Sequence, residues 1–349
     1  MAVTLTTLPQ IFALGFDSII DVRSPAEWAE DHIPGAINLP VLNDAERAEV
    51  GTIYKQVSPF TARKIGGALV AKNAAAHLQG PLADKTGGWK PLVYCWRGGQ
   101  RSGSFTSILQ QVGWRADVIA GGYKAWRKLV VDQVHERPVP SPVVLLDGNT
   151  GSAKTEVLAL LAAQGVQVID LEGMARHRGS LFGALPGGQP SQKTFEGALA
   201  LALARLDPAR PVVVEAESSK VGNCRIPAPL WKAMVAAPRI EIVAPLAARA
   251  AYLTRAYADL LADPARLVQV IALLRPLHPA VVIEAWQAQA GAGAFTDLAE
   301  GLMARHYDPR YAKHRGRLAV PVQRVAVDSL APAALPELAA RIAARLHDR

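Results

Sequence analysis

A glycine-containing loop near the middle of the chain limits the folds open to this sequence more than any other segment. Residues 143–147 are apolar up to Asp147, residues 148–153 form the loop, and a helix is expected from Lys154. Backbone N–H groups of such a loop can surround a diphosphate, while Lys154 reaches its outer oxygens and Thr155 binds Mg²⁺. A strand, a loop and a helix in this order predict a parallel α/β sheet with a phosphate site at its edge.

One residue of this loop departs from the usual pattern. Ala153 stands where phosphate-binding loops of this kind have their second glycine. An alanine fits there if the backbone is helical, whereas a positive φ would weaken the grip on phosphate. The residues expected to hold the phosphate groups are Gly148, Asn149, Thr150, Gly151, Ser152, Lys154 and Thr155.

A second loop of similar build follows the expected strand 91–94 and carries a cysteine. Residues 94–102 contain Cys95, two glycines, Arg97 and Arg101, and a helix is expected from about residue 102. Loop N–H groups, the helix terminus and the arginines would lower the thiol pKa and hold an anion. We therefore predict that Cys95, Arg97 and Arg101 are catalytic. Cys224 lacks such surroundings and is expected to be an inert buried cysteine.

The chain is long enough for two domains. Prolines at 138, 140 and 142 predict a stiff, extended boundary, which gives domains at 1–136 and 137–349. The first domain begins with an expected strand at 17–22 and a helix capped by Ser24. In the second, further strands are expected at 166–170, 211–215, 239–243 and 320–327. Helices separate them, as in a parallel sheet, and residues 245–303 are expected to form a helical insertion.

Acidic residues end two strands of the second domain. Asp170 and Glu172 follow one strand, and Glu215 and Glu217 follow another, so all four should lie near the phosphate loop. They are candidates for acid–base catalysis or Mg²⁺ binding, although none is a certain metal ligand. A polar stretch nearby supplies the candidate substrate-binding residues His177, Arg178, Ser180, Gln189 and Gln192.

Charge and composition favour an anionic partner. The formal net charge is +8, which suits nucleic acid. Residues 305–317 gather cations, which contact phosphates, and tyrosines, which stack on unpaired bases. The residues expected to contact RNA are Arg305, Tyr307, Arg310, Tyr311, Lys313, Arg315 and Arg317. No secretory signal or apolar stretch of membrane-spanning length is evident, and two cysteines form no disulfide framework, so a cytoplasmic protein without membrane contact is expected.

The cysteine loop, residues 21–28 and residues 32–40 together resemble the rhodanese family, whose domains carry sulfur as a cysteine persulfide. Residues 121–126 are similar to that family's closing Gly-Gly segment. The resemblance implies that Cys95 carries a chalcogen and that Asp21 supports the loop. The spacing from Cys95 to Arg101 is that of cysteine phosphatases, one residue longer than the usual sulfur-carrying loop. A phosphatase therefore stays open as an alternative, although it would need a general acid.

Stretches across most of the chain resemble bacterial tRNA 2-selenouridine synthases. They are residues 49–55, 170–173, 177–180, 189–192, 215–218 and 306–311. The resemblance implies an α/β protein with an N-terminal rhodanese-like domain and a C-terminal P-loop NTPase-like parallel-sheet domain with a helical insertion. It also implies a transferase that converts wobble 2-thiouridine of tRNA to 2-selenouridine with selenophosphate, via S-geranylation from geranyl diphosphate.

The same resemblance implies no tightly bound cofactor, with selenophosphate and geranyl diphosphate as co-substrates and Mg²⁺ as a candidate ion. A selenophosphate-supplying enzyme is a candidate partner beside tRNA. Two further alternatives stay open: a rhodanese-type sulfurtransferase coupled to a nucleoside-triphosphatase, and a non-catalytic RNA-binding module.

Overall fold

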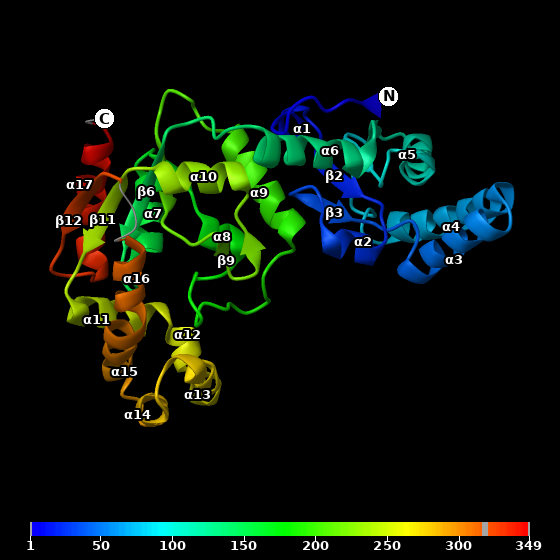
Figure 1. The fold of residues 1–349 in the computed structure, drawn as a ribbon. Coiled ribbons are helices and arrows are strands. Elements are labelled where there is room, and N and C mark those ends of the chain that lie inside the picture. Colours follow the sequence, from blue (N-terminus) through cyan, green and yellow to red (C-terminus); the bar gives the residue numbers. More distant parts are fainter. Residues whose placement is uncertain (1, 316–319, 348–349) are drawn as a thin grey trace. The chain divides into compact units, whose positions relative to one another are not determined.

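The computed structural model describes residues 2–315 and 320–347, and the chain divides into two compact units (Figure 1). The first unit contains Met1–Arg137 together with Pro190–Arg205, and the second contains Pro138–Gln189 together with Leu206–Arg349. The chain first passes from one unit to the other at the proline-containing stretch.

The first unit is built on a five-stranded parallel sheet with the order β1-β5-β4-β2-β3. Its strands are β1 (Ala2–Val3), β2 (Ser18–Asp21), β3 (Ala36–Asn38), β4 (Pro91–Tyr94) and β5 (Asp117–Ile119). Its helices are α1 (Gln10–Ala13), α2 (Pro25–Glu30), α3 (Asp44–Gln56), α4 (Pro59–Gln79), α5 (Gln100–Val112), α6 (Gly122–Val131) and α9 (Gln192–Ala204), with a π-helical turn η1 (Asp132–Glu136). The strands expected at 17–22 and 91–94 are confirmed as β2 and β4.

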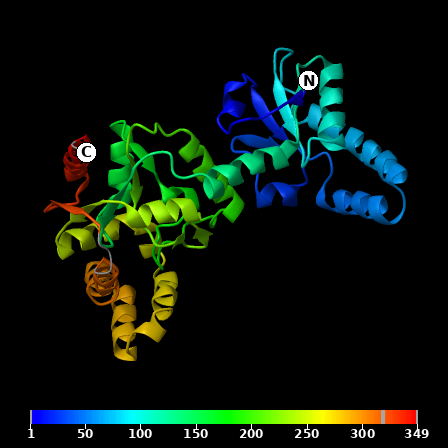
Figure 2. The same ribbon diagram turned by 45° about the horizontal axis from the view of Figure 1, so that its top comes forward.

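Local signals set two helical features of this unit. Helix α2 begins after Ser24, the N-cap that the sequence predicted, and the Glu27 carboxylate accepts a hydrogen bond from the backbone N–H of Ser24 at 3.1 Å. Helices α3 and α4 pack side by side as a helical hairpin (Figure 2). Ser58, in the turn between them, is the N-cap of α4. This hairpin borders the helix that follows the cysteine loop, since α4 also packs against α5.

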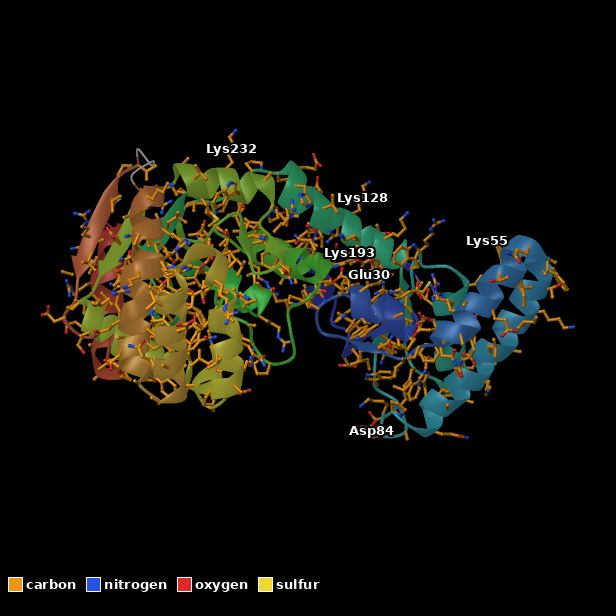
Figure 3. All side chains as sticks on the ribbon, turned by 60° about the horizontal axis from the view of Figure 1, so that its bottom comes forward. Glu30, Lys55, Asp84, Lys128, Lys193 and Lys232 are labelled. Atoms are coloured by element: carbon orange, nitrogen blue, oxygen red, sulfur yellow. The ribbon has the colours of Figure 1, made fainter. Side chains whose placement is uncertain are left out.

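Helix α9 belongs to the first unit although it lies far along the chain. It packs against α6 and η1. Arg127 forms an ion pair with Glu196, which is buried, and Lys193 forms one with Glu30 (Figure 3). These charge pairs fix the helix on the first unit, an arrangement that the strand and helix pattern of the sequence did not indicate.

The second unit is also built on a five-stranded parallel sheet, with the order β12-β11-β6-β8-β7. Its strands are β6 (Val143–Gly148), β7 (Gln167–Ile169), β8 (Val212–Glu215), β11 (Arg239–Val243) and β12 (Val322–Ala326), and β9 (Lys220–Val221) and β10 (Cys224–Arg225) form a small antiparallel hairpin. Every strand expected in this half of the chain is confirmed, and the phosphate loop lies at the carboxyl end of the central strand β6.

Helices surround this sheet and extend from it. They are α7 (Lys154–Ala163), α8 (Leu171–Ala175), α10 (Ala228–Ala236), α11 (Leu246–Ala256), α12 (Ala258–Leu261), α13 (Pro264–Ala272), η2 (Arg275–Leu277), α14 (Ala280–Gly291), α15 (Phe295–Leu302), η3 (Met303–Tyr307), α16 (Asp308–Arg315), η4 (Pro332–Ala334) and α17 (Leu335–His347). The expected helical insertion is confirmed by α11 to α15, called the helical lobe below (yellow to orange in Figures 1 and 2).

The helical lobe has its own apolar core, which includes Leu267, Ile271, Trp286 and Leu298. Within the described ranges, no helix is both long enough and apolar enough to span a bilayer.

Candidate active sites

The first candidate site is the cysteine loop at the carboxyl end of β4. Cys95 is buried, and its Sγ lies 3.2 Å from Oγ of Ser102. Burial alone would raise the pKa of the Cys95 thiol, but hydrogen bonds from Ser102 and the positive charge of Arg101 outweigh burial and lower it. Because the thiolate is the nucleophilic form, this environment favours a reactive cysteine.

The Gly-Gly segment that begins α6 closes over this loop. The backbone N–H of Tyr123 donates to the carbonyl oxygen of Cys95 at 2.8 Å. Gly122 has φ +55°, and a Cβ atom there would lie 2.3 Å from that same oxygen. Gly98 is equally confined, since its Cβ would lie 2.5 Å from the carbonyl oxygen of Ile119. Only glycine fits at these two positions, so the segment fixes the backbone of the cysteine loop.

A buried ion pair supports the cysteine loop. Asp21 accepts a 2.6 Å hydrogen bond from Nη2 of Arg23, and both side chains are buried. The same guanidinium lies 4.1 Å from the ring centroid of Tyr123, whose hydroxyl donates to Asp31 at 2.6 Å. Asp21 therefore acts through Arg23 on the closing segment, in agreement with its expected supporting role.

The two arginines of the loop take different positions. Arg101 donates to both carboxylate oxygens of Glu27, at 2.7 and 3.2 Å, and Glu27 also pairs with Arg47 at 3.1 Å. Arg97 is exposed. A phosphatase loop needs its arginine free to hold phosphate, so the pairing of Arg101 disfavours that alternative.

The second candidate site is the phosphate loop after β6. Nζ of Lys154 donates to the carbonyl oxygen of Gly148 at 2.9 Å. Ala153 is buried and has φ +60°, so the unfavourable case considered from the sequence applies. A left-handed alanine costs roughly 1–2 kcal/mol. The loop therefore stores backbone strain at the position where the usual pattern has glycine.

Asp147, at the end of β6, anchors the loop. Its carboxylate accepts hydrogen bonds from Arg315 and Arg239, each at 2.9 Å. Burial would raise the pKa of Asp147, but these two arginines hold it at about 2. Arg315 also donates to the side chain of Asn149 at 2.7 Å and to Glu241 at 2.6 Å. Arg315, one of the arginines expected to contact RNA, thus binds the carboxylates of Asp147 and Glu241 next to the phosphate loop.

A third arginine, which sequence reasoning did not single out, binds the backbone of the phosphate loop. Arg249 is buried in α11, donates to the carbonyl oxygen of Thr150 at 3.1 Å, and pairs with Asp308 at 2.8 Å. It therefore connects the loop to α16.

The four predicted acidic residues do meet beside this loop. Oγ1 of Thr155 donates to Glu172 at 2.9 Å, and the backbone N–H of Glu172 donates to Glu215 at 2.7 Å. Burial, with the charge of Asp170 nearby, raises the pKa of Glu215 well above its ordinary value. Burial and Glu172 also raise the pKa of Glu217 to about 8, although Lys154 opposes the shift. Over the described ranges, no group of three or more acidic, histidine or cysteine side chains is arranged to hold a metal ion.

Among the candidate substrate-binding residues, two line the pocket at the phosphate loop. Arg178 donates to Asp259 at 2.7 Å through Nη2, while its buried Nη1 has no hydrogen-bond partner in the described structure. The hydroxyl of Ser180 lies 3.1 Å from that of Tyr257. Ser152 of the loop also has a buried hydroxyl without a partner among the described residues. An anion in the pocket would satisfy these donors.

The other three lie elsewhere. Gln189 donates to the carbonyl oxygens of Ala175 and Val221, each at 3.1 Å, and so holds the β9–β10 hairpin. Gln192 lies at the start of α9 in the first unit. His177 follows α8, and burial lowers the pKa of its imidazole.

The phosphate loop borders two hollows that share a wall. One is a polar pocket beside Lys154, and the other is an apolar cavity in the helical lobe. The residues that line both are Thr150, Ser180, Leu253, Tyr257 and Tyr307. The deeper cavity wall includes Phe182, Leu260, Leu267, Phe295, Leu298 and Ala299. A ligand with an anionic head and an apolar tail fits this arrangement.

The residues expected to contact RNA divide into three groups. Tyr307 and Tyr311 line the polar pocket, and Nζ of Lys154 lies 5.9 Å from the ring centroid of Tyr311. Those with exposed side chains are Arg305, Arg310 and Lys313. Arg315 is bound beneath the loop, as described above, and Arg317 lies outside the described residues.

Comparison with known proteins finds a family match for each of the two domains. Residues 6–129 match the profile of the rhodanese-like domain, and residues 141–270 match that of the tRNA 2-selenouridine synthase AAA domain. Relatives named tRNA 2-selenouridine synthase include those of Alcanivorax borkumensis, 40% identical over 66% of this chain and 64% of that protein, and Aeromonas salmonicida, 39% identical over 68% and 64%. The relative from Chromohalobacter salexigens is 39% identical over 70% of this chain and 66% of its own length.

The matched part of the chain thus spans slightly less than two thirds of these relatives. In this chain the rhodanese-like domain precedes the AAA domain, and each has its loop at the carboxyl end of a central parallel strand. The chain is therefore similar to tRNA 2-selenouridine synthases over a rhodanese-like domain at residues 6–129 and an AAA domain at residues 141–270.

Proposed function

We propose that this protein converts wobble 2-thiouridine of tRNA to 2-selenouridine, with selenophosphate as selenium donor and geranyl diphosphate as the source of a transient S-geranyl group. The relatives named for tRNA 2-selenouridine synthesis support the overall reaction. The observation that carries the geranyl step is the apolar cavity that shares a wall with the phosphate pocket.

A prenyl diphosphate has the two parts that these hollows suit. Lys154, with the loop N–H groups, Arg178 and Ser152, would hold the diphosphate, and the hydrocarbon chain would enter the helical lobe between Tyr257 and Tyr307. A nucleoside triphosphate would place the polar atoms of its sugar and base against apolar side chains, which costs free energy when those atoms stay unpaired. The cavity therefore favours the geranyl donor over the nucleoside-triphosphatase alternative.

In the geranyl step, the sulfur of 2-thiouridine forms a bond to C1 of the geranyl group while the bond from C1 to diphosphate oxygen breaks. The diphosphate leaves with the electron pair, so cationic groups that hold it lower the barrier. Lys154 is placed for this role, since burial lowers the pKa of its ammonium but Tyr311 and the nearby carboxylates outweigh burial and raise it. Lys154 therefore stays charged at neutral pH.

Thr155 and Glu172 fit a Mg²⁺ ion that arrives with the diphosphate. Mg²⁺ in phosphate sites is held by one or two protein oxygens together with phosphate oxygens, which agrees with the lack of a larger acidic cage among the described residues. The ion would neutralise charge on the departing diphosphate. Glu172 would then exchange its hydrogen bond from Thr155 for the ion.

Cys95 would serve the selenium step in the first unit. Its lowered pKa and the fixed loop around it suit a nucleophilic chalcogen carrier. Alkylation of the thiocarbonyl sulfur makes that sulfur a better leaving group. Selenium of selenophosphate would form a bond to C2 of the base while the C2–S bond breaks and geranyl thiolate leaves, and water would then cleave the P–Se bond, which releases phosphate and leaves selenium on the base. The two units would therefore carry out successive steps on the same base.

Mass spectrometry of nucleosides tests this division. Thiolated tRNA is incubated with selenophosphate and geranyl diphosphate, and the wild type is compared with Cys95→Ala and Lys154→Ala. We expect 2-selenouridine from the wild type, S-geranylated base without selenium from Cys95→Ala, and neither product from Lys154→Ala. An unchanged nucleoside with the wild type under all conditions would contradict the proposed function.

The cavity can be tested separately by Ala299→Leu, which adds bulk to its wall. Calorimetry should show weaker binding of geranyl diphosphate but unchanged binding of inorganic diphosphate, because only the tail is excluded. Equal weakening of both ligands would show that the cavity does not hold the tail.

A further inference from the structure

The first unit contains a second hollow that neither loop explains. A groove lies between the α3–α4 hairpin and α5. We call it the hairpin groove, and its walls include Val50, Tyr54, Arg63, Gly67, Gln100 and Ser104. Val50 and Tyr54 line its α3 side, and they belong to residues 49–55, a stretch to which the proposed chemistry gives no role.

The hairpin groove adjoins the cysteine loop. Gln100 and Arg101 line it and belong to the run that begins at Cys95, and the next residue, Ser102, contacts the Cys95 sulfur at 3.2 Å. A molecule in the groove would therefore lie next to the reactive cysteine of the same unit.

The charges and rings of the groove suit a nucleotide. Tyr54 and Arg63 are both exposed, so a ring face and a guanidinium are free for a ligand. Arg101 lines the groove and pairs with Glu27, which also pairs with Arg47, so two cations share this one carboxylate. Lys55 extends from the same hairpin (Figure 3). Exposed aromatic rings among cations typically stack on unpaired bases and contact phosphates.

A pair of glycines in the middle of α4 supplies an independent observation. Glycine disfavours a helix interior relative to other residues, so its presence in a 21-residue helix calls for a reason. Packing requires glycine at neither position of the Gly66-Gly67 pair. A Cβ on Gly66 would make ordinary van der Waals contact with Val50 at 3.4 Å, and a Cβ on Gly67 would meet no atom within 4 Å. Both glycines line the groove. The missing side chains keep the groove open.

We infer that the hairpin groove binds an unpaired nucleotide of the RNA substrate, with its base on Tyr54 and its phosphate near Arg63. This inference rests on the proposed function for the identity of the RNA as tRNA. The groove would hold a nucleotide of the anticodon loop while the neighbouring wobble base reaches Cys95.

Binding of an anticodon stem-loop RNA with 2-thiouridine at the wobble position tests the groove. Fluorescence anisotropy at one fixed salt concentration compares the wild type with Gly67→Leu, which fills the groove, and Tyr54→Ala, which removes the ring. We expect Gly67→Leu to weaken binding about tenfold or more, and Tyr54→Ala about fivefold or more, the loss typical of one base stack.

Gly51→Leu is the matched control, because Gly51 is an exposed glycine of α3 with open space around it that does not line the groove. It should bind RNA within about twofold of wild type. Thermal unfolding should show that both leucine variants are at least as stable as wild type, since leucine favours a helix more than glycine does.

The outcomes separate the two proposals. Wild-type affinity for RNA in Gly67→Leu and Tyr54→Ala, with normal selenation by the wild type, would overturn the groove and leave the proposed function in place. A wild-type protein that neither binds nor modifies the RNA would overturn both.

Discussion

The raised pKa of Glu217 should control how tightly the phosphate pocket binds a diphosphate as pH changes. Glu217 lies beside Glu172 and Lys154 in that pocket, and burial together with Glu172 raises its pKa to about 8. The other charged residues that line the pocket are Glu156 and Arg178. At pH 7 Glu217 is therefore mostly neutral and repels a phosphate little, whereas at pH 9 it carries a full negative charge next to the ligand.

The size of the effect follows from the titration. With a pKa of about 8, the protonated fraction falls roughly tenfold between pH 7 and pH 9, which corresponds to about 1.4 kcal/mol if only the neutral form binds. Affinity should therefore fall about tenfold over this range. The folded pKa lies above the unfolded value, so the same group stabilises the ligand-free protein at low pH, and this stability is lost as pH rises toward 8.

Calorimetry of geranyl diphosphate without divalent cations measures the effect. The wild type should lose affinity from pH 7 to pH 9, and Glu217→Gln should bind with near wild-type affinity at pH 7 and show a flat profile. Glu284→Gln, at an exposed glutamate of α14, is the control and should follow the wild type. A flat wild-type profile, or an unchanged slope in Glu217→Gln, would refute the assignment.

Three further predictions test the loops and their supports. Gly122→Ala should abolish selenation but keep geranylation in the nucleoside assay, because its Cβ would lie 2.3 Å from the carbonyl oxygen of Cys95; Gly103→Ala, with open space in α5, should keep both. Asp147→Asn should lower the free energy of unfolding in urea by about 3–5 kcal/mol, because two arginines lose their carboxylate; a loss below about 1 kcal/mol would contradict this. Ala153→Gly should change that free energy by less than about 1 kcal/mol, since relief of left-handed strain offsets added chain entropy and a lost buried methyl; a loss above about 2 kcal/mol would show that Ala153 is not strained.

The sequence predicted those parts of the fold that depend on local signals. Strand β4 was expected at 91–94 and begins and ends at those residues, and α7 begins at Lys154 as expected. Both follow from short apolar runs that end in glycine-containing loops, a pattern that needs no distant contact. Carboxylates at strand ends were likewise predictable, because parallel strands place their carboxyl ends at one edge of a sheet.

Long-range placements were not predictable in this way. Helix α9 joins the first unit through the Arg127–Glu196 pair, which links residues far apart in the chain. Arg239 and Glu241 alternate with isoleucines along β11, an interior strand, and both side chains are buried. Charged residues in such a strand are a sequence signal for buried ion pairs, but the strand pattern does not identify the residues that pair with them. The role of Arg315 beneath the loop depends on the fold of the whole second unit.

The two loops use positive charge in different ways, and this difference bears on what each holds. In the cysteine loop, Arg101 is already paired with Glu27. Its charge lowers the pKa of the Cys95 thiol and is not free to bind a large anion. In the phosphate pocket, Nη1 of Arg178 and Oγ of Ser152 are buried without partners in the described structure. An unpaired buried donor costs about 1–3 kcal/mol, which a bound anion would recover. An anionic ligand would therefore complete the phosphate pocket of the second unit, whereas Arg101 of the cysteine loop already has its carboxylate partner.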